Sequence, residues 1–387
     1  MKILYVSAIE LNVDGGPKTH IIEIIREMHN LGHEIFLLTP PFDRDRLSLP
    51  VKVLHYPFWG YSFVRRIISY FFLFVLLVWS ISRFKPTIVY ERQMEYNPFV
   101  YLVCRLLKLP FFVEINGLFI DDLKQTGAGH ISIATHSVTE RKEFHWATGI
   151  LCTSPRLKEI ITCGQEYLAN KICFVPNGVN RDLFRPLDKL KCQNKIGLNP
   201  EMKYIGYVGT FNHLHNSEHV IEIFSRLSGK IPEAKLIMVG DGPRRKNCEM
   251  TVAKLELSGK VIFTGLVRYE DVPVYINSFD IGIVLATKQR LEREGVVAFK
   301  LFELLSCGCP TIAHYKDHKD YEYFSPFVKM VHVDDQLGIS KAIIEVFRNP
   351  DECAGMAEQA LSFINKNISW EKSALITLDF ITTITSS

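Results

Sequence analysis

Residues 300–313, KLFELLSCGCPTIA, have the pattern of a helix, a tight turn and the start of a strand. Lys300 and Glu303 are three residues apart, so they share one face of a helix, and most of the residues around them are apolar. Gly308 allows the turn, and the β-branched Thr311 begins the strand. This stretch therefore predicts a helix-to-strand unit that presents one cation and one carboxylate on the same helix face.

The same alternation of strand and helix continues along the chain in both directions. Short β-branched and aromatic runs alternate with helical stretches, which is typical of βα units and parallel sheets. Expected strands cover residues 2–7, 34–39, 51–56, 87–91, 111–115, 149–153 and 171–175, and then 204–209, 235–239, 261–264, 280–285, 311–313 and 329–333. Expected helices cover residues 19–31, 63–84, 98–107, 138–146, 155–163, 217–227, 246–257, 271–277, 299–306, 339–347, 351–366 and 370–384. The two sets of strands predict an α/β fold with two doubly wound parallel sheets.

The length and composition fit two such domains. The chain has 387 residues, of which 47% are hydrophobic and 22% are charged, which excludes a disordered or fibrous protein. A polar stretch at residues 180–199 separates the two sets of strands and is interpreted as a linker. We predict a Rossmann-like domain at residues 1–185, a second at 186–366, and a helix at 367–387 that packs back on the first. The carboxyl ends of two facing sheets would border an interdomain cleft, where a ligand with phosphates should bind.

The charge of the chain is small but unevenly distributed. The net charge is +3, which argues against a dedicated nucleic-acid-binding protein. No acidic residue lies between Asp45 and Glu91, whereas six lysines and arginines do, so this stretch carries +6. The anions that this protein meets are therefore expected on particular surfaces rather than over its whole exterior.

An uncharged run of sixteen residues lies in this basic stretch. Residues 67–82, IISYFFLFVLLVWSIS, have basic residues on both sides and aromatic residues near both ends. A spanning helix needs about 20 residues, whereas basic flanks and aromatic residues are typical of a helix that lies in a membrane interface. We therefore expect contact with an anionic membrane surface at residues 61–85. A buried helix of the domain and a spanning helix are the alternatives.

Cysteines and acidic motifs give no sign of a metal site. The nine cysteines include no CxxC pair and are expected to be reduced. Asp43-Arg44-Asp45 superficially matches a metal-binding DxD motif, but it follows the second strand, away from the predicted cleft, and we expect no metal there. Residues 1–8 have the pattern of a strand rather than of a signal peptide. We predict a cytoplasmic protein, peripheral on the inner face of the cell membrane.

Three glycine-containing loops follow predicted strands. Gly15-Gly16 lies before a helix, where adjacent glycines allow close approach and helix N–H groups favour a pyrophosphate. This loop matches neither the GxGxxG pattern nor GxxxxGK[ST]. Gly209-Thr210 and Gly240-Asp241-Gly242 offer similar approach in the second domain. Arg244 and Arg245, beyond the third loop, either add positive charge or form a solvated helix face.

Together these residues resemble the family 4 glycosyltransferases of the GT-B fold, which use nucleotide-sugar donors and retain the anomeric configuration. Six landmarks occur in the family's order: Gly15-Gly16 with His20; Leu109-Pro110 through Glu114-Ile115-Asn116-Gly117; Pro176-Asn177-Gly178-Val179-Asn180 with Phe184 and Pro186; Val208-Gly209-Thr210-Phe211 through His215; Val239 through Pro243; and Lys300 through Pro310. No single landmark is specific, but the combination covers almost the whole chain. The resemblance implies two facing Rossmann-like domains with a nucleotide between them.

The resemblance also implies roles for individual residues. Lys300 would be the cation on the diphosphate, and Glu303 would hold the donor ribose. The residues that would line the donor are Gly15, Gly16, Gly209, Gly240, Asp241 and Gly242. Where the family often has an arginine and a lysine as phosphate ligands, this sequence has Thr210 and His215, so Lys300 is expected to carry more of the charge.

A second departure concerns the donor sugar. The family's paired acidic motif has a glutamate eight residues before the position of Glu303, and here that residue is Gly295. Either the neighbouring Glu294 contacts the sugar as a catalytic residue, or backbone N–H groups do, those of Gly295, Val296 and Val297. On the acceptor side, the residues that could assist the acceptor hydroxyl are His20, Glu114 and Asn116.

The leading hypothesis is a metal-independent, retaining enzyme of cell-surface glycan biosynthesis. It would move a sugar from a UDP- or GDP-sugar to a lipid-linked or growing saccharide acceptor, with no cofactor besides this co-substrate. One alternative is a soluble glycosyltransferase that makes a small glycoside. Another is a catalytically inactive, glycan-binding or scaffold relative, which the missing charges at Thr210 and Gly295 motivate.

Overall fold

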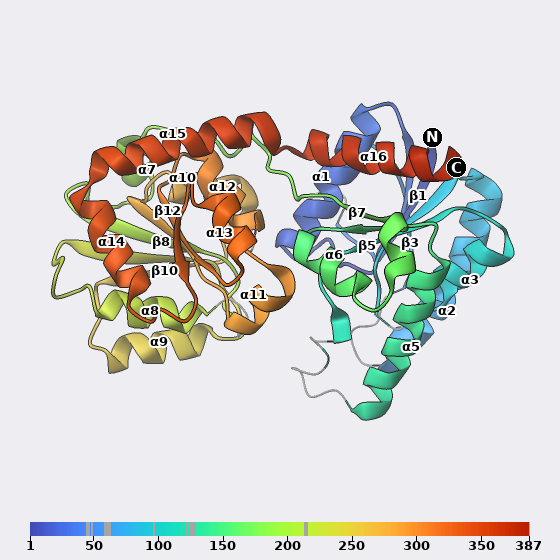
Figure 1. Ribbon diagram of the computed structural model, residues 1–387, viewed down its shortest axis with the longest axis horizontal. Coiled ribbons are helices and arrows are strands. Elements are labelled where there is room, and N and C mark those ends of the chain that lie inside the picture. The colour runs from blue at the N-terminus through green and yellow to red at the C-terminus, as the bar shows by residue number, and fades with distance from the viewer. Residues whose placement is uncertain are drawn as a thin grey trace. The chain divides into compact units, whose positions relative to one another are not determined.

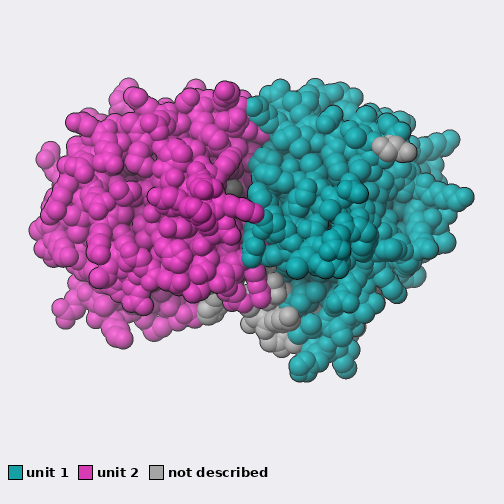
Figure 2. All heavy atoms as spheres, in the orientation of Figure 1, with its two compact units in different colours: residues 1–176, 370–387 teal, residues 177–369 magenta. Residues whose placement is uncertain are grey.

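The computed structural model describes residues 1–43, 47, 49–57, 63–95, 97–120, 123, 129–212, 216–296 and 298–386. The chain divides into two compact units, which Figure 2 colours separately: unit 1 is Met1–Pro176 with Trp370–Ser387, and unit 2 is Asn177–Ser369. The first division thus falls earlier than residue 185. Phe184 belongs to unit 2, because it is fully buried in the core of that unit and its carbonyl accepts a hydrogen bond from Ser306 Oγ at 2.6 Å.

Unit 1 contains a parallel sheet in the order β3-β2-β1-β4-β5-β6-β7. Its strands are β1 (Lys2–Val6), β2 (Glu34–Thr39), β3 (Lys52–His55), β4 (Ile88–Arg92), β5 (Phe111–Ile115), β6 (Gly149–Cys152) and β7 (Ile172–Phe174). The strand order reverses between β1 and β4. In such sheets ligands bind beyond the carboxyl ends of the strands at this switch point, so the loops after β1 and β4 are the ones to examine.

Helices cover both faces of this sheet (Figure 1). Alternate residues of β1 point to opposite faces, with Leu4 and Val6 in one core and Ile3 and Tyr5 in the other. The helices on the first face are α2 (Phe63–Phe84), α3 (Phe99–Leu106), α5 (His130–Trp146) and α6 (Pro155–Thr162), followed by the short η1 (Glu166–Lys171). The helices on the second face are α1 (Gly16–Asn30) and α16 (Trp370–Ser386).

Unit 2 contains a second parallel sheet, in the order β10-β9-β8-β11-β12-β13. Its strands are β8 (Lys203–Val208), β9 (Ala234–Val239), β10 (Val261–Gly265), β11 (Ile281–Val284), β12 (Thr311–Tyr315) and β13 (Lys329–His332). One face is covered by α8 (Ser217–Ser225), α9 (Arg245–Lys254) and α14 (Gly338–Arg348), the other by α10 (Val272–Ile276), α12 (Ala298–Ser306) and α15 (Pro350–Asn367). The switch point lies between β8 and β11. The predicted class, two doubly wound parallel sheets, is confirmed.

The interpretation of residues 180–199 as a linker is wrong. This stretch belongs to unit 2 and contains α7 (Lys189–Lys195), in which Cys192 and Gln193 are buried. Leu187 N–H donates to Asn277 Oδ1 at 2.7 Å, which fixes the stretch against α10. Polar composition misled the prediction because these polar groups are satisfied by contacts within unit 2. The sequence also did not predict the short η3 (Tyr269–Asp271), α11 (Lys288–Glu294) and α13 (His318–Phe324).

Helix α2 has the predicted bounds and two different faces. Tyr70, Leu73 and Leu77 are buried against the sheet. The outward face is also apolar, with these residues exposed: Val64, Ile68, Phe71, Phe72, Val75, Val78 and Trp79. The buried-helix alternative therefore accounts for one face only. Among the helices described, none is both long and apolar enough to cross a bilayer.

Candidate active site

The loops after β8 and β9 are bonded to one another at the switch point of unit 2. Gly209 N–H donates to Val239 O at 2.9 Å, and Phe211 N–H donates to Asp241 O at 2.9 Å. Gly209 has a φ of +150°, which glycine adopts far more readily than other residues. The two predicted glycine loops thus form one rigid backbone structure at the end of the sheet.

Gly240 and Gly242 allow the two loops to pack closely against each other. A Cβ on Gly240 would collide with the carbonyl oxygen of Gly209, and a Cβ on Gly242 would lie 2.5 Å from that of Phe211. Asp241 Oδ1 accepts a hydrogen bond from Gly242 N–H at 2.7 Å. The glycines of this loop therefore have a structural explanation in loop packing, besides their predicted position near a donor.

Lys300 lies directly against the first of these loops. Its position on α12 places Nζ where a Cβ of residue 209 would be, and Nζ is 5.7 Å from the centroid of the Tyr207 ring. Burial lowers the pKa of Lys300 to about 7, and the nearby charge of Arg290 adds to this effect, while Glu303 opposes it. Only a glycine at position 209 leaves room for Lys300 Nζ beside this loop. Because the pKa of Lys300 is about 7, a bound anion would readily favour its charged ammonium form.

Glu303 lies one turn further along α12 and is 6% exposed. Its Oε1 is buried and has no hydrogen-bond partner in the part of the chain that the structure describes. Burial raises the pKa of Glu303 to about 8, against the opposing effects of the Tyr269 hydroxyl and Lys300. Tyr269 was missed by the sequence analysis because it comes from a separate segment, η3. This oxygen of the carboxyl group is available to accept a hydrogen bond from a hydroxyl group.

Helix α11 ends at the position where the family has its first glutamate. Gly295 is the C-terminal cap of α11 with a φ of +73°, a left-handed conformation that favours glycine. Glu294 accepts a hydrogen bond from Arg290 Nε at 2.9 Å. Glu294 is therefore held by a cation of its own helix in this structure.

Asp320 of α13 lies beside Gly295 and was not predicted. Its Oδ2 accepts a hydrogen bond from Val296 N–H at 3.2 Å, and lies 3.2 Å from the position that a Cβ of Gly295 would take. The Val296 N–H group, which the sequence analysis offered to the sugar, is thus already bonded. A carboxylate from another helix occupies the neighbourhood of the absent glutamate, which no local sequence pattern could indicate.

Arg244 and Arg245 do not add free charge to the site. Arg244 binds Glu218 through two nitrogens, at 2.5 and 2.8 Å. Arg245 Nε donates to Glu249 Oε1 at 2.6 Å, and its guanidinium lies 4.7 Å from the centroid of the Phe263 ring. His215 and Val297, as well as Arg44 and Asp45 of the DxD motif, lie outside the described residues. In the described ranges no cluster of His, Cys, Asp or Glu could hold a metal ion.

The acceptor-side residues of unit 1 converge on Glu114. Oε1 of this carboxylate accepts hydrogen bonds from Arg92 at 2.9 Å and Asn116 at 2.5 Å, and lies 2.8 Å from His20 Nε2. Tyr90 hydroxyl donates to the other oxygen at 2.8 Å. Burial alone would raise the pKa of Glu114, but the charge and hydrogen bond of His20, with Arg92 and Asn116, hold it well below its ordinary value. Glu114 is therefore an ionised, fully engaged carboxylate that orients its partners.

Parallel pairing brings these residues together. Arg92 ends β4 opposite Glu114 of β5, and His20 comes from α1, which follows β1. His20, Glu114 and Asn116 are among the predicted site residues, whereas Arg92 and Tyr90 are not. The predicted Gly15-Gly16 loop lies at the start of the same helix, α1. Gly15 is its N-terminal cap with a φ of +154°, and a Cβ on Gly16 would meet only open space. The first turn of α1 has no acidic residue and no side-chain cap, so its N–H groups are suited to an anion.

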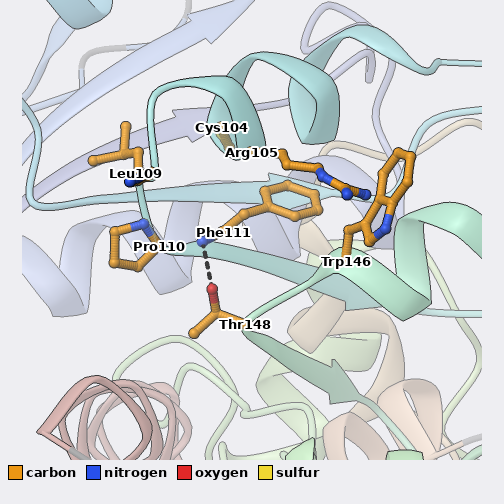
Figure 3. Close-up of a pocket in the computed structure, with 8 residues that line it drawn as sticks. Cys104, Arg105, Leu109, Pro110, Phe111, Trp146 and Thr148 are labelled. Carbon is orange, nitrogen blue, oxygen red and sulfur yellow. Dashed lines mark hydrogen bonds between the residues drawn. The ribbon is translucent and has the colours of Figure 1, made fainter.

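A separate pocket of about 300 Å³ lies at the other end of this sheet, where α3 ends and β5 begins (Figure 3). Arg105 extends over the Trp146 ring, 4.0 Å from its centroid, and Lys108 also lines the pocket. Leu106 and Leu107, between these two cations in sequence, are 81% and 54% exposed. These two leucines and the outward face of α2, which packs on α3, are exposed and apolar and have basic residues nearby in sequence; they are referred to below as the α2–α3 face.

Two family models match successive parts of the chain. The first, described as Glycosyltransferase Family 4, matches residues 14–183, and the second, described as Glycosyl transferases group 1, matches residues 188–363. Between them they cover most of both parallel-sheet units. The chain belongs to the family 4 glycosyltransferases of the GT-B fold, and the resemblance noted in the sequence is confirmed.

Individual relatives are distant. The chain is 24% identical over 220 residues to alpha-monoglucosyldiacylglycerol synthase of Streptococcus pneumoniae, covering 55% of this chain and 48% of that protein. The chain spans about half the length of the first curated relatives it matches. Sucrose-phosphate synthase of Thermosynechococcus elongatus has a TM-score of 0.79 at 15% identity, and HepE of Anabaena, solved with UDP, has 0.77 at 15%. Each covers 100% of both chains, and at this identity the likeness shows the fold.

Proposed function

We propose that this protein is a retaining glycosyltransferase that takes its sugar from a UDP- or GDP-sugar. The observation that carries the proposal is the Lys300–Glu303 pair, which α12 presents beside the Gly209 loop at the switch point of unit 2. A buried lysine beside backbone loops suits a diphosphate. A buried carboxyl oxygen without a partner among the described residues suits a ribose hydroxyl. HepE, of the same fold, has been solved with UDP.

The chemistry assigned to Lys300 is stabilisation of the leaving group. The bond between the anomeric carbon and the diphosphate oxygen breaks, and its electron pair stays with the nucleoside diphosphate. An approaching diphosphate favours the ammonium form of Lys300, whose pKa is about 7 in the empty site. The acceptor oxygen bonds to the anomeric carbon on the same face, and its proton passes to the departing diphosphate oxygen.

Unit 1 is assigned to the acceptor. Glu114 is held by four donors and stays ionised, so its role is to orient His20 and Asn116 rather than to exchange a proton. His20 also packs edge-to-face against Trp370, with ring centroids 5.1 Å apart, so the imidazole is fixed from two sides. A fixed imidazole at the end of the sheet is suited to position an acceptor hydroxyl.

We also propose that the α2–α3 face binds an anionic membrane surface, where a lipid-linked acceptor is available. Seven apolar residues of α2 recur at helical spacing on the outward face, and Trp79 is 50% exposed. Arg65, Arg83, Arg105 and Lys108 supply positive charge around it. A relative in Streptococcus pneumoniae is named as a synthase of a glucosyldiacylglycerol, a lipid-linked sugar. This supports an acceptor in cell-surface glycan biosynthesis.

A catalytically inactive, glycan-binding relative is the second candidate. Gly295 stands in place of a glutamate, Glu294 is paired with Arg290, and Val296 N–H is bonded to Asp320. These contacts leave the donor sugar without the carboxylate that the family provides there.

A donor screen tests both candidates. The purified protein is incubated with UDP-, GDP- and ADP-sugars, with and without membrane lipids, and release of nucleoside diphosphate is followed. Release with one donor, reduced about 10²–10³-fold in Glu303→Ala, supports the transferase. Binding of glycans without binding or hydrolysis of any donor supports the inactive relative. A small-molecule acceptor in lipid-free solution would favour the soluble enzyme.

A further inference from the structure

Arg290 of α11 has a buried guanidinium that is only partly engaged. Its Nε donates to Glu294 Oε2 at 2.9 Å, and the side chain is 15% exposed. Its Nη1 is buried and has no hydrogen-bond partner among the residues that the structure describes. Leaving a buried charged donor without an acceptor is costly, so this atom is expected to find an acceptor in a ligand.

The fold places this guanidinium near Lys300. Helix α11 follows β11, the strand next to β8, and its first turn is fixed by the hydrogen bond from Arg290 N–H to Thr287 Oγ1 at 3.3 Å. The positive charge of Arg290 acts on both Lys300 and Tyr207, whose ring lies 5.7 Å from Lys300 Nζ. Two cations from different helices are therefore close enough for their charges to interact.

In the part of the chain that the structure describes, one carboxyl group acts on each of these cations: Glu303 on Lys300 and Glu294 on Arg290. Glu303 is held largely in its protonated form at neutral pH by burial, which raises its pKa to about 8. Glu294 already receives a hydrogen bond from Arg290. Two like charges brought together in this way repel each other when the site is empty, and an anion of two or more charges relieves that repulsion. A diphosphate has this charge.

We propose that Arg290 is a donor-binding residue that supplies the second positive charge for the diphosphate. It would take the place of the arginine that the family often has where this chain has Thr210. Through Nη1 the guanidinium donates to a phosphate oxygen, while Nε keeps its hydrogen bond to Glu294, which becomes a positioning residue for Arg290. This inference rests on the proposed function and names a residue of the same site.

The test compares diphosphate binding by the full-length wild type, Arg290→Gln, Arg290→Lys and the control Arg226→Gln. Arg226 is an exposed arginine of unit 2 whose Nη1 bonds to Gln336 O. Binding of UDP, GDP and inorganic pyrophosphate is measured by calorimetry, with UMP and GMP as probes that lack the second phosphate. We expect Arg290→Gln to weaken diphosphate binding by about ten- to a hundredfold, Arg290→Lys to weaken it less, and the control to match the wild type.

A second readout separates a direct role from a structural one. Removing the charge of Arg290 should raise the pKa of Lys300 toward its ordinary value, so the loss of UDP or GDP binding with rising pH should move to higher pH in Arg290→Gln. The groups acting on Lys300 in this window are Arg290 and Glu303. Thermal stability should change little, because the variant loses only the Nε hydrogen bond to the partly exposed Glu294, and Nη1 has no partner among the described residues to lose.

The outcomes distinguish two failures. If the wild type binds none of the nucleotides or pyrophosphate, the proposed function fails and Arg290 loses its role with it. If the wild type binds UDP or GDP and Arg290→Gln binds it equally well with the same pH dependence, the inference is overturned while the proposed function stands.

Discussion

Replacing Glu303 with glutamine should make the unliganded protein more stable at high pH relative to the wild type. The folded protein holds this carboxyl at a pKa of about 8, whereas the unfolded chain has the ordinary value of 4.5. The raised pKa means that the carboxyl is protonated in the folded state and ionised in the unfolded state between these two pH values. Its contribution to stability is therefore complete below pH 4.5 and is lost as pH rises through this window.

The size of the effect follows from these two pKa values. Each unit of pKa difference corresponds to about 1.36 kcal/mol, so ionisation of the unfolded chain costs the wild type about 1 kcal/mol at pH 5 and about 4 kcal/mol at pH 8. Glu303→Gln cannot ionise. The difference in unfolding free energy between variant and wild type should thus change by about 3 kcal/mol from pH 5 to pH 8 in favour of the variant.

Urea unfolding followed by circular dichroism at both pH values measures this change. Any fixed cost of packing an amide in place of the carboxyl cancels in the comparison of the two pH values. A variant-to-wild-type difference that is the same at both pH values would refute the assignment of Glu303 as a buried, protonated carboxyl.

Three further predictions concern other parts of the molecule. Gly209→Ala should weaken UDP or GDP binding, measured by calorimetry, at least about tenfold, because the new Cβ would displace Lys300 Nζ. The control Gly229→Ala has open space around the new Cβ and should bind as the wild type does. Burial and the neighbouring Glu143 raise the pKa of Glu91 in the folded protein, so ionisation at pH 8 favours the unfolded chain. Glu91→Gln removes this effect and should raise the Tm at pH 8 by a few degrees; an unchanged Tm would contradict the prediction. Phe71→Glu should reduce flotation with anionic vesicles severalfold, whereas Met250→Glu, at an exposed apolar position of unit 2, should not.

The fold could be predicted from sequence because each element carries its own periodic signal. Helix α2 is predicted with its observed bounds, since its uncharged run is long and flanked by basic residues. Helix α7 was missed because its polar side chains are satisfied by residues far along the chain, such as Ser278, whose carbonyl accepts from Gln193 at 3.2 Å. No local pattern reports such a partner.

The candidate site was predicted only where a motif is local. Lys300 and Glu303 lie on one helix, so their spacing alone placed them together. Arg290 of α11 and Tyr269 of η3 act on them from two other elements, and Asp320 of α13 lies beside Gly295. Only the fold of unit 2 brings these separate segments together. Gly240 was expected to admit a ligand, yet the backbone of Gly209 occupies the space where its Cβ would be. Sequence shows that a position needs glycine but not which atom approaches it.

The most direct test of the central claim is the rate of nucleoside diphosphate release from the preferred UDP- or GDP-sugar by the wild type and Lys300→Met. The matched control is Lys341→Met, an exposed lysine of α14. We predict sugar transfer by the wild type and the control, and a reduction of about 10²–10³-fold in Lys300→Met. Equal rates in all three proteins, or no release from any donor by the wild type, would contradict it.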